Sequence, residues 1–324
     1  MLNIFKQPPF VGIIAFLAVF MVQPLGHIAM ILMEKLITGG HKWYSPIYDG
    51  NPPVIPQGYE NFALIDNDIY WSAFGLGAVG LAVIIWGIRR NTEIAGTWAG
   101  FVGASLLWTG WVEFAIHFFA RYYGVKALCA PGQWAYACAT NPSTKPEYFL
   151  MQGSVGFMLA IGFFFLFNKE TRCNAFRWVQ RNFHLNVGKP SKGLTRNFAN
   201  IVAAETIGIL WFFYVYLMFI YDENFFGEHH WFTYLSLVGF GVWSLYLLSR
   251  LIRYKRVTSA LRYGIPTALI FWNTIEIMGR WHWFGEFWIH PLEYKIPSAI
   301  VAVAVVAFAV ISVKSARKKT NQID

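Results

Sequence analysis

Charge is scarce in this sequence: 13% of the 324 residues are Asp, Glu, Lys or Arg, whereas 56% are hydrophobic. In soluble domains about a quarter of the residues are charged. The apolar residues here form runs of about twenty, the length with which a helix crosses a bilayer. The composition therefore excludes an ordinary soluble domain and predicts an all-α integral membrane protein.

We expect a bundle of about eight transmembrane helices that forms one polytopic membrane domain over residues 1–324. The first run continues through Pro24 with no small-residue cleavage site, so it is interpreted as a span rather than a signal peptide. Pro24 is expected to bend that helix. The predicted spans are about 10–33, 69–88, 97–121, 150–168, 198–221, 231–252, 262–283 and 296–314.

The basic residues predict the orientation of these helices, because Lys and Arg beside spans stay on the cytoplasmic side. Alternate connections and the two ends of the chain hold 19 of the 26 Lys and Arg residues. Both termini are therefore expected in the cytoplasm, in a multi-pass protein of a bacterial inner membrane. The net charge of +9 is then a signal of topology and of attraction to anionic lipid, and nucleic acid is not expected as a partner.

Cysteine is also scarce, with three residues and no Cys-x-x-Cys pair. Thiolate zinc, iron–sulfur and thioredoxin-type chemistry therefore have no support in the sequence. Cys129 and Cys138 fall in one outward connection and could form a disulfide in an oxidising compartment, whereas Cys173 falls inside. Two free thiols are the alternative.

Ionisable residues inside the predicted spans are the main functional signal, because such groups are costly in hydrocarbon unless they are paired, wetted or bound. Glu113 and His117 lie four residues apart in "EFAIH", and the same spacing returns at Glu286 and His290 in "EFWIH". At ~1.5 Å per residue, several of these groups fall in the outer third of the bilayer. Six of the eight histidines gather in that layer.

Imidazole and carboxylate together are suitable ligands for iron, manganese, copper or zinc. We therefore expect a membrane metalloenzyme with a His/Glu-bound centre, di-iron first and copper as an alternative, that oxidises a lipid or another apolar small molecule. Arg280, four residues after Glu276, could pair with that carboxylate, and the two are candidate catalytic residues. The candidate metal ligands are His27, Glu113, His117, His229, His230, Glu276, His282 and His290.

Two other functions remain open at this point. An electron-transfer subunit could bind quinone or haem b, with His27 and His117 as axial ligands from two helices. A transporter or a non-catalytic subunit of a larger membrane complex could use Glu113, Glu276 and Arg280 as a proton or substrate path. The protein could also have a redox partner or other membrane subunits as partners. For each border histidine, ordinary packing in the interfacial belt is the structural alternative.

Overall fold

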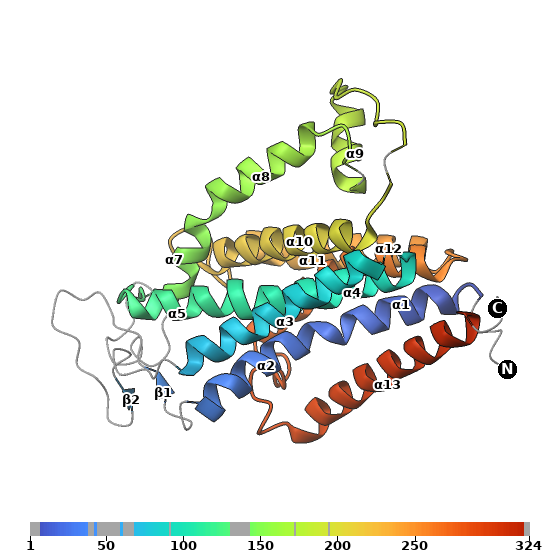
Figure 1. Ribbon diagram of the computed structural model, residues 1–324. Coiled ribbons are helices and arrows are strands. Elements are labelled where there is room, and N and C mark those ends of the chain that lie inside the picture. The colour runs from blue at the N-terminus through green and yellow to red at the C-terminus, as the bar shows by residue number, and fades with distance from the viewer. Residues whose placement is uncertain are drawn as a thin grey trace. The chain divides into compact units, whose positions relative to one another are not determined.

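The described part of the chain folds mainly into helices. In the computed structural model the described residues are 7–37, 42–43, 59–60, 68–90, 92–129, 143–171, 173–193 and 195–320. Two short strands, β1 (Lys42–Trp43) and β2 (Tyr59–Glu60), pair in parallel. The helices are α1 (Phe10–Phe20), α2 (Val22–Ile37), α3 (Asp68–Arg90), α4 (Glu93–Leu107), the π-helix η3 (Trp108–Glu113), α5 (Phe114–Tyr122), α7 (Pro146–Gly153), α8 (Val155–Phe167), α9 (Asn174–Asn182), α10 (Phe198–Tyr221), α11 (Trp231–Leu251), α12 (Val257–Arg280) and α13 (Lys295–Thr320) (Figure 1).

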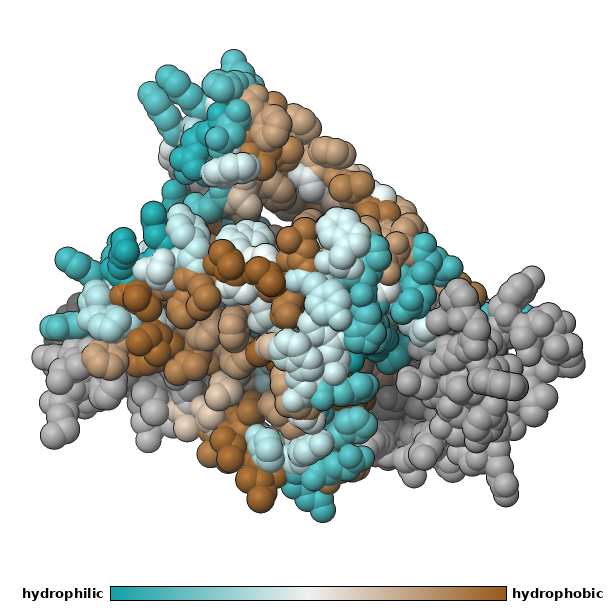
Figure 2. All heavy atoms as spheres, turned by 180° about the vertical axis from the view of Figure 1, so that it is seen from behind, coloured by the Kyte–Doolittle hydropathy of each residue, from teal (hydrophilic) through white to brown (hydrophobic). Residues whose placement is uncertain are grey.

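Six helical segments are long and apolar enough to cross a membrane. They confirm that the chain is an all-α protein of the multi-pass membrane class. They match the first six predicted spans, and large hydrophobic areas cover the face of the described residues in Figure 2. The segments are Phe10–Met33, Ile69–Arg90, Glu93–Ala120, Pro146–Phe167, Phe198–Tyr221 and Trp231–Leu251.

The last two predicted spans also form helices, α12 and α13, but neither belongs to those six. In α12, Asn273, Glu276 and Arg280 interrupt the apolar sequence. In α13 the residues whose side chains the structure describes form the shorter apolar segment Lys295–Ala307. The count of eight spans and the cytoplasmic position of both termini therefore stay predictions.

The first predicted span contains the expected break, which lies just before Pro24. Helix α1 ends at Phe20, Met21 is a turn residue, and α2 begins at Val22. Proline has no N–H for the carbonyl four residues earlier, and its ring clashes with that carbonyl, here the one of Phe20. The break therefore follows from Pro24, and it sets the direction of the segment that carries His27.

By their internal contacts the residues divide into two compact units. Unit 1 comprises Met1–His41, Ile65–Phe74 and Trp231–Asp324, and unit 2 comprises Lys42–Leu64 and Gly75–His230. Unit 1 therefore contains α1, α2, α11, α12 and α13, and unit 2 contains α4, η3, α5 and α7 to α10. Helix α3 contributes to both.

In unit 1, α12 packs against α1 and α11. The α1–α12 contact depends on small residues: a Cβ on Gly264 would lie 3.3 Å from the carbonyl oxygen of Ala15. One cluster of buried side chains contains Val11 and Leu251, and a second contains Ile28, Trp272 and Trp288. The second cluster includes Trp272, one helical turn before Glu276.

In unit 2, α10 packs closely along α4. Gly96 and Gly100, four residues apart on α4, allow the two backbones to approach, and a Cβ on Gly100 would lie 2.6 Å from the carbonyl oxygen of Ala199. Small residues at such spacing are typical of helix contacts in membranes, where close packing replaces the hydrophobic effect. Helix α7 packs on both α5 and α10, and it joins the polar residues of the second site below.

The described residues test the cysteine predictions only in part. Cys173 is a free, half-buried cysteine before α9. Cys138 lies outside the described residues, so the Cys129–Cys138 disulfide stays a prediction.

Candidate intramembrane polar sites

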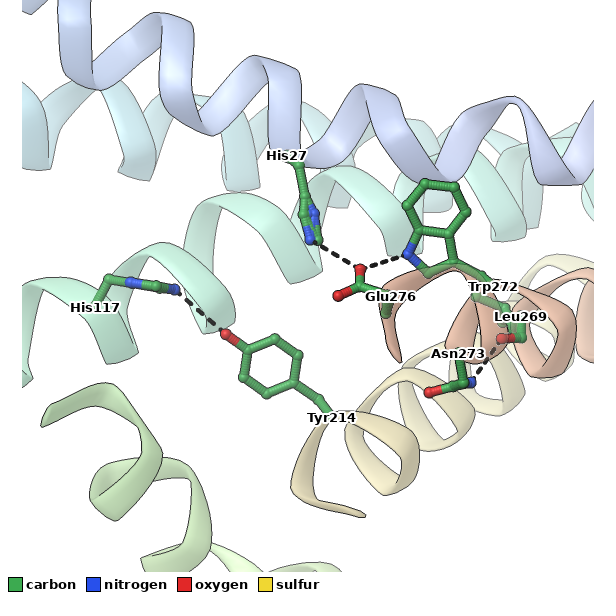
Figure 3. A network of polar contacts seen from close by, with 7 residues as sticks. All are labelled: His27, His117, Tyr214, Leu269, Trp272, Asn273 and Glu276. Carbon is green, nitrogen blue, oxygen red and sulfur yellow. Dashed lines mark hydrogen bonds and ion pairs between the residues drawn. The ribbon is translucent and has the colours of Figure 1, made fainter. Parts of the chain in front are cut away.

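The first polar site lies in unit 1 and joins α2 to α12. The Nε2 atom of His27 lies 3.5 Å from Oε1 of Glu276. The same oxygen accepts a hydrogen bond of 2.6 Å from the indole Nε1 of Trp272. Figure 3 shows this oxygen between the imidazole and the indole, with a dashed line to each. One carboxylate oxygen therefore accepts a hydrogen bond from the neutral indole of Trp272 and faces the imidazole of His27, which can gain or lose a proton.

Helical spacing on α12 builds this arrangement. Trp272 and Glu276 are four residues apart and so lie on one face of the helix. The indole of Trp272 is buried, and its ring centroid lies 4.9 Å from that of Trp288 and 5.5 Å from that of Phe20. This packing fixes the direction of the Nε1 donor. The neighbouring Asn273 amide donates to the carbonyl of Leu269 at 2.8 Å, so it serves the helix backbone (Figure 3).

The second polar site lies in unit 2 and joins α5, α7 and α10. The Nδ1 atom of His117 lies 3.5 Å from Oε1 of Glu147, and its Nε2 atom lies 3.3 Å from the hydroxyl of Tyr214 (Figure 3 shows the second contact). Glu147 is 6% exposed. If Nδ1 donates to the carboxylate, Nε2 accepts from the phenol, and one neutral tautomer satisfies both contacts. The imidazole is thus positioned between a proton donor and a proton acceptor.

A π-helix lies immediately before this histidine. The N–H of Phe114 bonds to the carbonyl of Thr109, five residues earlier, so Trp108–Glu113 form a wider turn than an α-helix. The indole of Trp108 packs edge-on against Tyr214 at 6.1 Å between ring centroids. Single π turns inside α-helices are frequent at functional sites. Here the turn ends at Glu113, which is 5% exposed, and α5 then carries His117.

A third polar cluster surrounds Asp222 at the end of α10. This carboxylate is fully buried, and it accepts hydrogen bonds from Gln152 at 2.8 Å, from Thr144 at 3.3 Å and from both the backbone and the side chain of Asn224 at 2.8 Å. A buried carboxylate with so many donors is satisfied where it is. We therefore assign Asp222 a structural role: it holds α7 and the connection after α10 together.

The remaining predicted ligands lie outside these two sites. His229 and His282 are exposed, and the latter is in the turn after α12 with a positive φ of 57°. His230 is half-buried beside Phe226, with 5.4 Å between the ring centroids. His290 is exposed and pairs with Glu293 at 3.6 Å.

The two copies of the Glu-x-x-x-His motif have different structures. Glu113 and His117 lie in the helical segment from η3 into α5, whereas Glu286 and His290 lie in turns between α12 and α13. The carboxylate of Glu286 lies over Gly279, where an added Cβ would be 2.6 Å from its Oε1 atom. Arg280 is the last residue of α12, four residues after Glu276. The first copy therefore lies in a helical segment long and apolar enough to span a membrane, whereas the second lies in the turns between two helices.

Within the described ranges, no three His, Cys, Asp or Glu side chains converge as ligands of one metal ion would. The predicted ligands divide between the units: His27, Glu276, His282 and His290 belong to unit 1, and Glu113, His117, His229 and His230 belong to unit 2. Each unit by itself offers a histidine–carboxylate pair, which is a titratable site or part of a ligand set.

Two residues of the second site, Glu147 and Tyr214, and one of the third cluster, Gln152, were missed from the sequence. Glu147 stands next to Pro146 in the first turn of α7, where an acidic residue is also explained by the helix dipole. Tyr214 is one of sixteen tyrosines, and Gln152 is uncharged, so neither stood out. The signal that could have identified Glu147 is its place at the membrane border, opposite the end of the helix that carries His117.

Comparison of the chain with protein-family models, curated proteins and solved structures finds no match.

Proposed function

We propose that this multi-pass membrane protein takes up and releases protons at two His–carboxylate pairs in its spans, and that it works in proton translocation or proton-coupled transport. The observation that carries the proposal is the contact between His27 and Glu276, from two helices, with Trp272 donating to the same oxygen. We assign it eight spans, cytoplasmic termini and a place in a bacterial inner membrane.

The energetics of charge in a bilayer support a proton function. Ionisable groups at membrane depth are costly and are typical of proton relays and substrate paths. A His–Glu pair can be neutral as imidazole and carboxylic acid, or carry both charges after one proton moves between them. Imidazole has its ordinary protonation equilibrium near neutral pH, so its charge changes under physiological conditions. Such a pair can therefore move a proton internally while it stays neutral overall, and it carries a net charge only in the step in which a proton enters or leaves.

The second pair supports the same function. His117 is flanked by the Glu147 carboxylate and the Tyr214 hydroxyl. A proton accepted on one ring nitrogen can be released from the other, which makes a bridging imidazole a relay group. Neither Arg nor Lys is required for this step.

Proton flux in proteoliposomes tests the proposal. Purified protein is reconstituted with a pH-sensitive dye inside the vesicles, and a potassium diffusion potential drives protons inward. We expect flux above that of protein-free vesicles, and we expect Glu276→Gln and Glu147→Gln each to reduce it at least ten-fold, because the amide keeps an acceptor oxygen but cannot exchange a proton. Glu293→Gln is the matched control, since it removes a carboxylate from an exposed His–Glu pair. Wild-type flux equal to that of empty vesicles would contradict the proposal.

A second candidate is the redox metalloenzyme. The observation that favours it is the mixed imidazole and carboxylate donor set in each unit, which suits iron with open coordination positions. In that function a di-iron centre oxidises a lipid or apolar substrate, with a redox partner supplying electrons. Elemental analysis and a visible spectrum of purified protein separate the candidates. About two irons per chain, lost in Glu113→Ala and His117→Ala, would favour the enzyme, copper would indicate the alternative metal, and a haem Soret band would indicate haem b.

A further inference from the structure

Helix α9 has two chemically different faces. Ala175, Val179 and Phe183 follow one another at intervals of four and form an apolar side. Arg177 and Arg181 share the opposite side and are exposed. Amphipathic helices with basic polar faces lie in the plane of a membrane surface.

Two large aromatic side chains of this segment are exposed at the protein surface. Trp178, at the boundary between the two faces, is 57% exposed, and Phe183, just after the helix, is 68% exposed. No residue of α9 is buried. Large aromatic side chains exposed on a helix of this kind are typical of the headgroup level of a bilayer, where one end of the ring is apolar and the other is wet.

The position of α9 is fixed by the end of a membrane-spanning helix. The amide of Gln180 donates to the carbonyl of Leu166 at 2.6 Å, and the hydroxyl of Thr171 donates to the carbonyl of Phe165. These are carbonyls of the last turn of α8, where a helix leaves acceptors for donors from outside it. The Phe165 carbonyl also accepts from the N–H of Asn168 at 3.3 Å. Figure 2 shows hydrophilic residues gathered at the α9 end of this part of the surface and hydrophobic residues along α8. The contacts therefore hold α9 at the depth where α8 leaves the hydrocarbon.

We propose that α9 is a binding surface for anionic phospholipid headgroups, with its apolar side in the bilayer and Arg177 and Arg181 on the lipid phosphates. The charge of the helix favours anionic headgroups as the ligand, because α9 carries two arginines and no acidic residue. Guanidinium groups bind phosphate through paired hydrogen bonds. The surface would make the protein depend on the lipid composition of its membrane, and it is separate from both His–Glu pairs.

The test measures the depth of α9 in the full-length protein. A nitroxide is attached to Val179→Cys in a Cys173→Ser background. Cys173 is the N-cap residue of α9, a position where serine is favoured, so this background retains the helix. The Cys173→Ser variant without the Val179 substitution is labelled in parallel, and its signal corrects for nitroxide attached to other cysteines. Relative access of oxygen and of a water-soluble nickel chelate then reports whether the label lies in lipid or water.

We expect the label to lie in lipid when the protein is in bilayers containing phosphatidylglycerol, and to move toward water in pure phosphatidylcholine. Each arginine near an anionic surface contributes about a five-fold factor, so Arg177→Gln with Arg181→Gln should weaken docking about thirty-fold. High salt should also weaken the docking of α9, because it screens the attraction between the arginines and the anionic lipid. The matched control, Lys189→Gln with Lys192→Gln, removes the same charge from the exposed connection after α9.

Two results would overturn the inference. One is equal label depth in both bilayers, whether in lipid or in water, and the other is equal losses in the two charge-removal pairs. The last would mean that net charge, rather than the face of α9, draws the segment to lipid. Because these measurements do not use proton flux, they stand or fall independently of the proposed function.

Discussion

The pH dependence of the Trp272–Glu276 hydrogen bond tests directly whether Glu276 exchanges protons. The bond measures 2.6 Å from Nε1 to Oε1. A hydrogen bond to a charged group contributes about 1.5–3 kcal/mol to stability, and a neutral one about 0.5–1.5 kcal/mol. The same bond should therefore be stronger by about 1 kcal/mol when Glu276 is a carboxylate than when it is protonated.

A double-mutant cycle with Trp272→Phe and Glu276→Gln isolates this difference. Glutamine retains an oxygen that can accept from the indole, so the cycle reports the part of the bond that depends on charge. Trp272→Phe also removes packing around the indole, which is 8% exposed, but it does so with either Glu or Gln at position 276. This packing loss therefore cancels from the coupling energy. The contact with His27 at 3.5 Å is likewise altered equally in both. The coupling energy should be about 1 kcal/mol at alkaline pH and should vanish as the pH falls and the carboxylate takes a proton.

The assay is unfolding of the purified protein in mixed detergent micelles, followed at several pH values between about 5 and about 9, a range that spans the ordinary titration of histidine. Wild type, both single variants and the double variant are compared at each pH. A coupling energy that is constant over this range would show that Glu276 keeps one charge state there. That result would refute the assignment of the His27–Glu276 pair as a proton-exchanging site, whatever the absolute stabilities are.

Three further predictions concern the packing of α10 on α4, the Asp222 cluster and the Cys173 thiol. Gly100→Ala should destabilise the protein by about 1–3 kcal/mol in thermal unfolding, because its Cβ would lie 2.6 Å from the Ala199 carbonyl oxygen, whereas Gly208→Ala on α10, with no atom within 4 Å, should be nearly neutral. Asp222→Ala should cost about 3 kcal/mol in the same assay because it leaves buried donors unpaired, and Asp222→Asn should cost less because it retains an acceptor oxygen. Burial raises the pKa of the Cys173 thiol, so maleimide followed by mass spectrometry should label it at neutral pH more slowly than an exposed cysteine introduced at Asn182; equal rates would contradict this.

The membrane-spanning helices could be predicted because hydrocarbon imposes a simple rule of length and apolarity. The first six predicted spans coincide with observed helices to within a few residues at most ends. Pro24 gave a further correct detail, since a missing N–H has a local consequence. For the polar helix α12 the same rule is weaker, because Asn273, Glu276 and Arg280 lower its apolarity.

The polar sites could be predicted only in part because the partners of a side chain depend on tertiary contacts. Helical spacing places Trp272 and Glu276 on one face, but it does not show that Trp272 binds the carboxylate. The π turn at Trp108–Glu113 could not be found from periodicity, because it changes the register within a run that the sequence predicts as a regular helix. Glu147 was missed because its place in a first helical turn has an ordinary explanation.

Contact distance alone does not distinguish a functional His–Glu pair in this chain. His27–Glu276 and His117–Glu147 each measure 3.5 Å, and the pair His290–Glu293 measures 3.6 Å. The last pair has side chains that are 51% and 69% exposed, where solvent screening leaves little interaction energy. The other two pairs each have an aromatic partner: the Trp272 indole donates to the Glu276 carboxylate, and the Tyr214 hydroxyl contacts the His117 imidazole. Such a hydrogen-bond partner can stabilise one protonation state over the other. Because a proton in hydrocarbon has few alternative sites, these two pairs should control proton exchange, and loss of the exposed pair should leave it unchanged.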